Sequence, residues 1–423
     1  MKNKTVPRLV VMMFLQYFVQ GSWNMTMGLV LSTFGLSSII GTSYALLGVA
    51  TILSPLFIGM VADRFIASQK IMGILHLINA CVLFTIPSQI ESQNANMFLL
   101  LIFIVGILFY PTTALANNIS FRHINGAKTF PMIRVFGTFG FMMVGFLLGQ
   151  LGFSGSVMTY KIAAISAIVL GLYCFTLPKT PAAGKGKKLS LRDLLCLDAL
   201  SLFKDKNFTV FMVCTIFLMI PKTAYSAYVP VFLSALGFNN AATMMQIGIA
   251  TEVIFMFLLS LFLLKFGFKR IILWGAITWV LRSLLFSFAT MDSGIILIVI
   301  ALALQGICWD FFFTAGDIYV DNKANLKIKA QAQSLKFTIS NGLGLLFASS
   351  VTGYIFNHTV IDQGEDALKQ WQMFWIYPAV VAAIVAIVFL LIFKDKELIF
   401  KKKVIEEDSN AKTLTNCKKS INE

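Results

Sequence analysis

Apolar runs of about 20 residues recur along the whole chain and alternate with short polar breaks. As a helix, each run is long enough to cross a hydrocarbon core of roughly 30 Å. The alternation predicts an all-α membrane protein with twelve transmembrane helices. The predicted spans are 9–33, 41–62, 71–88, 97–119, 130–151, 159–177, 208–235, 242–264, 271–290, 294–318, 330–356 and 372–393.

One long polar insert divides the predicted spans into six and six. Its small and charged residues favour a flexible linker. Within it, Leu191 to Phe203 is amphipathic, which favours a helix lying along the membrane face. The predicted units are a six-helix bundle at 1–177, a cytoplasmic linker at 178–207, a second six-helix bundle at 208–394 and a cytoplasmic tail at 395–423.

Composition supports a protein that crosses the membrane many times. Hydrophobic residues make up 58% of the 423 residues and charged residues only 13%, against roughly 25% charged residues in soluble domains. The first apolar run extends to about Phe34, longer than the apolar region of a signal peptide, so it is predicted to remain as a span.

The sequence lacks the usual signatures of covalent chemistry. Its six cysteines have no Cys-x-x-Cys spacing, which argues against both a metal site and a disulfide framework. The three histidines are scattered, and neither Gly-x-Ser-x-Gly nor Gly-x-x-x-x-Gly-Lys occurs. We therefore expect no catalytic residue, no cofactor and no metal, and the protein is predicted not to be an enzyme.

The net charge of +15 is distributed as membrane topology requires. Lysine and arginine gather before the first span, after the last, and in every even-numbered break, whereas the other breaks are nearly free of cations. This asymmetry predicts that both termini lie in the cytoplasm. The basic segments lack interleaved aromatic residues, so nucleic-acid binding is not expected.

Two carboxylates lie deep inside predicted spans, Asp310 in span ten and Glu252 in span eight. An ionisable group at such depth is expensive, and it is a functional hypothesis by default. A buried carboxyl can take a proton from one side of the membrane and release it to the other. The alternative for each is a structural charge that holds helices together.

Cations also lie within the predicted spans. Arg134 opens span five, and it either serves the site or extends its charge to the nearby membrane surface. Lys222 follows Pro221 in span seven, where it would pair with a carboxylate or bind an anionic or hydroxyl-rich solute. Arg282 is interpreted as a structural partner of one of the acids. Span five also carries small residues predicted to pack closely against a neighbouring helix, namely Gly137, Gly140, Gly145 and Gly149.

Several short motifs occur together along the chain. They are Gln16-Tyr17, Gly21-Ser22-Trp23, Pro131 to Thr138, Leu197 to Leu200, Leu202 to Lys206, Trp309-Asp310-Phe311-Phe312 and Ala330 to Ser334. With these motifs the chain resembles, over most of its length, the bacterial nucleoside:proton symporters of the major facilitator superfamily. The loop Gly59-Met60-Val61-Ala62-Asp63-Arg64 is similar to that superfamily's cytoplasmic loop signature. The resemblance implies a solute site near the membrane midplane, reached alternately from each side.

The resemblance also implies which residues line the site. The acids would hold ribose hydroxyls or the proton, and the aromatic rings would stack on the base. The matching positions are Arg134, Thr138, Phe141, Glu252, Trp309 and Asp310. The chain departs from the family where Thr223 and Ser226 replace Gln and Asn beside Lys222, and where Ile249 and Gln305 replace Gln and Tyr.

The predicted function is therefore nucleoside import by proton symport, coupled through Asp310 and Glu252. The expected partners are a nucleoside, protons and the lipid bilayer, and the expected form is a monomer in the bacterial cytoplasmic (inner) membrane. A carrier of the same fold for sugars or other small polar metabolites is one alternative. A membrane receptor or scaffold that transports nothing is another.

Overall fold

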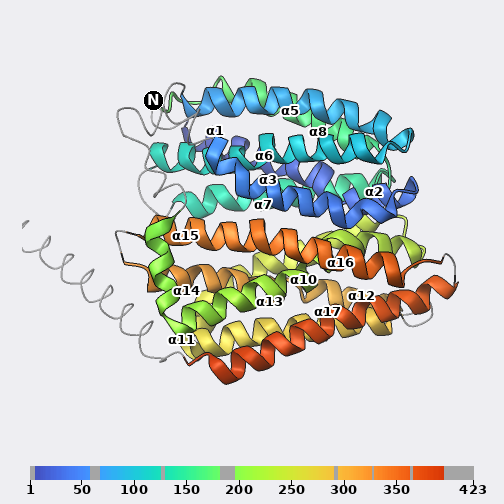
Figure 1. The fold of residues 1–423 in the computed structure, drawn as a ribbon. Coiled ribbons are helices and arrows are strands. Elements are labelled where there is room, and N and C mark those ends of the chain that lie inside the picture. Colours follow the sequence, from blue (N-terminus) through green and yellow to red (C-terminus); the bar gives the residue numbers. More distant parts are fainter. Residues whose placement is uncertain are drawn as a thin grey trace, which may run out of the picture.

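The structure is a computed structural model, and its described residues form helices and no strand. Figure 1 shows the helices running side by side in two groups, the first from α1 to α8 and the second from α10 to α17. The structure describes residues 5–57, 67–124, 129–181, 196–289, 294–325, 328–362 and 365–394.

The first half consists of long helices that follow the predicted spans. The first predicted span is two helices rather than one, because the chain leaves the helical conformation after Asn24 and resumes it at Met27. The elements are α1 (Thr5–Asn24), α2 (Met27–Thr33), η2 (Ser37–Ile39), α3 (Ile40–Phe57), α5 (Ser68–Glu91), α6 (Ala95–His123), α7 (Thr129–Gln150) and α8 (Met158–Cys174).

The second half contains two π-helical turns within its spans. One begins at Asp310 and the other at Thr338. The elements are η4 (Leu197–Lys204), α10 (Lys206–Ala235), α11 (Ala241–Phe288), α12 (Gly294–Ala303), α13 (Gln305–Trp309), η5 (Asp310–Thr314), α14 (Ala315–Lys323), α15 (Lys329–Phe337), η6 (Thr338–Gly344), α16 (Leu345–Thr359) and α17 (Glu365–Ile392).

The helices account for the twelve predicted membrane passages. Among the described residues, nine helical segments are long and apolar enough to cross a membrane. One of them, α11, makes two passages, because Gly267 at φ +78° lies in the left-handed region that favours glycine and breaks the helix there. The shorter apolar helix α8 and the pair α1 and α2 supply the remaining two passages.

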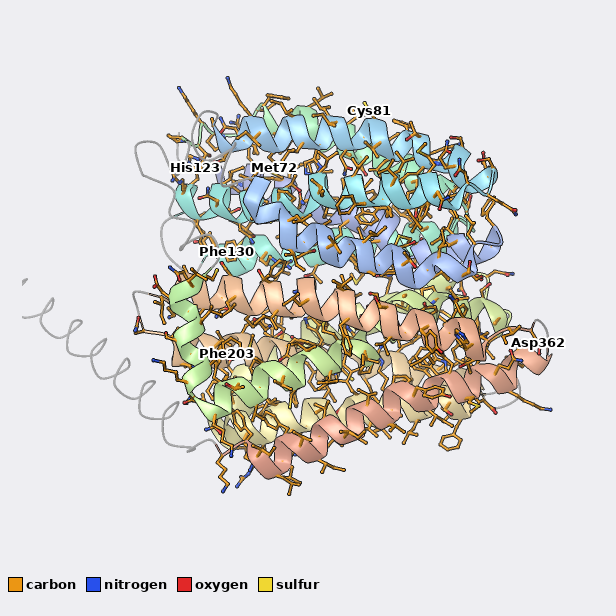
Figure 2. All side chains as sticks on the ribbon, in the orientation of Figure 1. Met72, Cys81, His123, Phe130, Phe203 and Asp362 are labelled. Carbon is orange, nitrogen blue, oxygen red and sulfur yellow. The ribbon has the colours of Figure 1, made fainter. Side chains whose placement is uncertain are left out.

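The molecule has two ends, which Figure 2 marks by labelled residues. His123 lies at the C-terminus of α6, and Phe203 lies on the same side, so this is called the His123 end. Asp362, between α16 and α17, lies at the opposite end, called the Asp362 end.

The two halves pack tightly at the Asp362 end. A Cβ atom at Gly41 of α3 would lie 2.5 Å from the Cα atom of Gly353 in α16. One at Gly28 of α2 would lie 2.1 Å from the carbonyl oxygen of Ala227 in α10. Asn357 also donates a hydrogen bond to the Ser38 carbonyl, at 2.9 Å. The backbones of the two halves are therefore in direct contact at this end.

The predicted small-residue face of α7 is confirmed. Gly137 packs against the Tyr17 ring and Gly140 against the Phe14 backbone, both in α1. Gly145 and Gly149 face the second half, where side chains of α11 approach them closely. One helix thus contacts α1 through its first turns and α11 through its last.

The chain enters the second half at Asp205, which caps α10. Its carboxylate accepts hydrogen bonds from the Phe208 backbone N–H at 2.9 Å and from Lys323 Nζ at 3.1 Å. Burial alone would raise the pKa of Asp205, but these donors hold it below its usual value. The contact ties the ends of α10 and α14 together.

Some predicted features lie outside the described residues. These include the loop signature Gly59 to Arg64, the linker from 182 to 195 and the tail from 395 onward. The described part of the predicted amphipathic helix is the 3-10 helix η4, which packs against α10 and α15.

Candidate transport site

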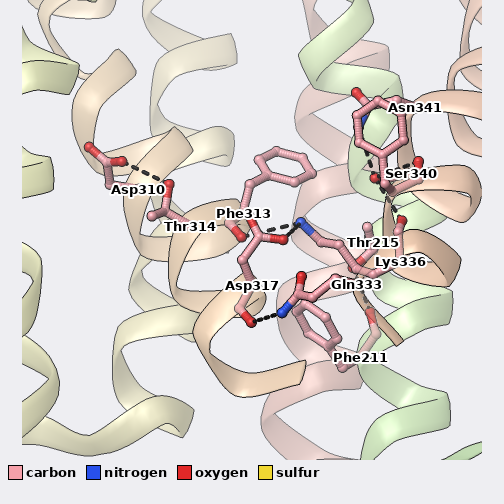
Figure 3. Close-up of polar contacts among 11 residues, drawn as sticks. Phe211, Thr215, Asp310, Phe313, Thr314, Asp317, Gln333, Lys336, Ser340 and Asn341 are labelled. Carbon is pink, nitrogen blue, oxygen red and sulfur yellow. Dashed lines mark hydrogen bonds and ion pairs between the residues drawn. The ribbon is translucent and has the colours of Figure 1, made fainter. Parts of the chain in front are cut away.

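Asp310 begins the π-helical turn η5, and its side chain is 1% exposed. Its Oδ1 accepts a hydrogen bond from Thr314 Oγ1 at 2.9 Å (Figure 3). Its Oδ2 is buried without a hydrogen-bond partner, and Asp310 makes no ion pair among the described residues. A buried carboxylate oxygen in this state is costly, so protonation or a ligand would relieve it.

Glu252 lies half-buried on α11 and interacts electrostatically with residues of both halves. Its charged neighbours are Arg134 of α7 and Arg282 of α11, and Gln305 hydrogen-bonds to its side chain. Asp310 also lies within electrostatic range of Glu252. The two acids predicted from the sequence therefore belong to one charged cluster.

Arg282 connects this cluster to the aromatic core. Its guanidinium carbon lies 3.4 Å from the centroid of the Tyr225 ring, and its Nη1 donates a hydrogen bond to Gln305 Oε1. The side chain is 1% exposed. Because Gln305 contacts both Arg282 and Glu252, the arginine is held close to the acid, as expected of a structural partner.

Lys222 and Trp309 approach each other from different helices. Lys222 is half-buried on α10, and its Nζ lies 5.9 Å from the centroid of the Trp309 ring on α13, which is within the range of a cation–π contact. Ser226 is directed to its own helix, where it donates to the Lys222 carbonyl oxygen at 2.9 Å. Thr223 is buried, and its hydroxyl has no hydrogen-bond partner in the part of the chain that the structure describes.

The predicted residues of α7 face the first helix. Arg134 lies with its guanidinium carbon 4.1 Å from the centroid of the Tyr17 ring. Phe141, two turns further along, packs beside Gly21 of α1. Arg134, Thr138 and Phe141 are all half-buried. Arg134 reaches Glu252 electrostatically across the two halves.

Sequence reasoning missed an ion pair next to η5 that has one buried partner, Lys336. Lys336 Nζ lies 2.5 Å from Asp317 Oδ1 and also donates to the Phe313 carbonyl at 3.4 Å (Figure 3). The Lys336 side chain is 7% exposed and the Asp317 side chain 49%. The available signal was a lysine several residues inside predicted span eleven. The pair joins α14 to α15, each next to a π-helical turn.

The two partners of this pair are expected to respond unequally to substitution. Asp317→Asn strands a buried ammonium, whereas Lys336→Met leaves a carboxylate that water can reach. We expect Asp317→Asn to lower the melting temperature of the purified protein in detergent more than Lys336→Met does. The double variant should recover most of the loss.

A matched control is Asp321→Asn, which breaks the exposed pair with Lys329 at 2.8 Å. Such surface pairs contribute about 0–1 kcal/mol, so the melting temperature should scarcely change. If Lys336→Met lowers the melting temperature more than Asp317→Asn does, the buried ammonium is not the more costly group to leave unpaired.

A second polar network that the sequence did not reveal lies inside the first half. Gln16 donates to Thr112 Oγ1 at 2.7 Å, and its Oε1 lies 2.8 Å from Nε2 of the buried His76. Asn79 is also fully buried, and its side-chain amide has no hydrogen-bond partner within the described segments. The network links α1, α5 and α6.

Comparison with known proteins agrees with this architecture. A family model described as Nucleoside H+ symporter matches residues 3–398. YegT of Escherichia coli (strain K12) is 32% identical over 93% of this chain and 95% of its own length. The nucleoside permease NupG of the same organism is 30% identical, over 92% and 96%. A crystal structure of NupG superposes with a TM-score of 0.82 at 28% identity, covering 92% of this chain and 99% of that one.

The match to this family model, the permease relatives and the superposition on NupG define the class: a secondary transporter with the major facilitator fold, not an enzyme. It is a multi-pass protein of the bacterial inner membrane. The chain belongs to the nucleoside H+ symporter family. The predicted fold class and the predicted function, proton-coupled nucleoside import, are confirmed at the level of this family.

Proposed function

We propose that the protein accumulates nucleosides in the cell and that Asp310 and Glu252 carry the coupled proton. One observation above all supports this assignment. The Asp310 carboxylate is buried and half unsatisfied, beside a second acid whose partners come from both halves. Two acids in one low-dielectric site disfavour double ionisation, so proton uptake stabilises the cluster.

The solute would bind between the halves at the remaining predicted positions. We assign stacking on the base to Trp309 and Phe141, and contacts with ribose hydroxyls to Glu252 and Arg134. The half-buried state of these four side chains supports this, because each keeps surface that another molecule can cover. The other proposed contacts are Thr138, Lys222, Thr223, Ser226 and Gln305.

The charge pattern supports an orientation with the His123 end and both termini in the cytoplasm. The Asp362 end would then face the periplasm, and its backbone contacts would make the described state closed to the outside. We propose that units 1–177 and 208–394 rock about the site between them and that the protein works as a monomer. Each proton moved inward would contribute roughly 2.3 kcal/mol of driving force per 100 mV of membrane potential.

The direct test is uptake of labelled uridine by a host that lacks its own nucleoside transporters. We expect the intracellular concentration to exceed the external one, and a protonophore to abolish that excess. If a protonophore leaves uptake unchanged, transport is not coupled to protons. Absence of uptake for every nucleoside, together with uptake of a sugar, would favour the carrier of other polar metabolites.

A further inference from the structure

Lys222 carries a positive charge that no described residue neutralises. It makes no ion pair among the described residues, and its Nζ donates no hydrogen bond to them. Among the described residues, the one cation–π contact of its ammonium is with the Trp309 ring, at 5.9 Å from the centroid. A desolvated ammonium within a membrane span is costly unless something else supplies acceptors.

The two acids of the site do not meet that need. Neither forms an ion pair with Lys222 among the described residues. Asp310 is hydrogen-bonded through Oδ1 to Thr314, and the charged neighbours of Glu252 are Arg134 and Arg282. Ser226 uses its hydroxyl within its own helix. The ammonium of Lys222 therefore remains available to a solute.

From this placement we propose that the transporter selects nucleosides whose base presents carbonyl oxygens or negative charge to Lys222. The relevant carbonyl is the one at position 4 of a pyrimidine or position 6 of a purine. Uridine and the 6-oxopurine nucleosides carry it, whereas cytidine and adenosine carry an amino group at that position. The inference rests on the proposed function and extends it to the class of base. Because Lys222 Nζ lies 5.9 Å from the centroid of the Trp309 ring, a base stacked on that ring would bring its edge towards the ammonium.

The chemistry of the ammonium sets the direction of this preference. Lysine offers three donors and no acceptor. The carbonyl oxygen at position 4 of uracil or position 6 of an oxopurine accepts a hydrogen bond from it. The amino group that cytosine and adenine carry at this position is a donor and cannot pair with the ammonium. Sites built to hydrogen-bond one group discriminate strongly against solutes that lack it.

The same cluster disfavours a phosphorylated solute. A phosphate group carries about −1.5 to −2 charges, and Glu252 and Asp310 lie in the same site. The net preference is therefore for acceptor groups on a neutral or singly anionic solute, which describes a nucleoside rather than a nucleotide.

The test is competition against labelled uridine by unlabelled nucleosides in intact cells. Two pairs isolate the base edge: uridine against cytidine, and inosine against adenosine. We expect the oxo member of each pair to compete at a concentration at least ten-fold lower. Xanthosine, whose base loses a proton readily, should compete at least as well as inosine.

Three substitutions assign the preference to the ammonium. Lys222→Gln supplies both a donor and an acceptor. In each pair, the ratio of the competing concentrations of the amino and oxo members should therefore fall towards one, even if total uptake falls as well. Lys222→Arg retains a cation without acceptors and should keep the order of preference. Lys369→Gln makes the same change on the exposed surface of α17 and should leave uptake and ratios unchanged.

The outcomes separate this inference from the proposed function. If no nucleoside is taken up, the proposed function itself fails. If nucleosides are taken up with equal competition within each pair, or if the preference survives Lys222→Gln, only the role of Lys222 is overturned.

Discussion

Asp310→Asn is expected to reduce concentrative nucleoside uptake at least ten-fold while sparing exchange of nucleoside across the membrane. Asparagine has nearly the shape of aspartate, and its carbonyl oxygen can still accept the hydrogen bond from Thr314. It cannot bind or release a proton. The variant should therefore bind solute and change conformation, but the proton gradient would no longer drive it.

Proteoliposomes allow the two activities to be measured on the same preparation. Uptake driven by an imposed pH gradient reports coupling, and counterflow of labelled against unlabelled uridine reports exchange. Asp362→Asn removes an exposed carboxylate at the Asp362 end and should leave both activities intact. Coupling would have to be assigned elsewhere if Asp310→Asn still accumulated uridine against its gradient.

The helices were predictable because a lipid bilayer permits few alternatives. A spanning segment must satisfy its backbone internally, so each long apolar run becomes a helix. The basic break between spans eight and nine coincides with the change of direction at Gly267 in α11. The π-helical turn at Asp310 was not predictable, because its hydrogen-bond register depends on packing against helices distant in sequence.

The candidate site was predictable only in part. Charges within apolar spans are conspicuous in a sequence, so Asp310, Glu252, Lys222 and Arg134 could be named. Arg282 could also be named as a partner of one of the acids, but most of the other partners could not, because they lie on other helices. Lys222 meets Trp309, and Arg282 meets Gln305, through tertiary packing alone. Lys336 was overlooked because its position near the start of a predicted span resembled that of an ordinary flanking cation.

The backbone contacts at the Asp362 end lead to the second large effect. A leucine at Gly41 would place its Cβ 2.5 Å from the Gly353 Cα and 2.8 Å from the Ser349 carbonyl oxygen. Both neighbours are backbone atoms, which a rotamer change cannot move. The cheapest relief is separation of α3 from α16, so Gly41→Leu should disfavour the state closed at this end.

A neighbouring position provides a matched control. Thr42 is exposed and lines a cavity of about 210 Å³ between α3 and α16. Thr42→Leu therefore adds similar bulk where space exists, and uptake should fall far less than in Gly41→Leu. For Gly41→Leu we expect uptake to fall at least ten-fold with uridine binding retained, because opening the Asp362 end does not remove the site.

The direction of the shift can be measured with a thiol probe. Ser349 is fully buried in the described state, so Ser349→Cys should react slowly with a membrane-impermeant maleimide added outside the cell. Adding Gly41→Leu should accelerate this labelling several-fold, whereas adding Thr42→Leu should not. Slow labelling in the Gly41→Leu background, with uptake intact, would show that the glycine contact does not hold this end closed. Rapid labelling with loss of uptake would instead identify Gly41 and Gly353 as the close approach on which the closed state depends.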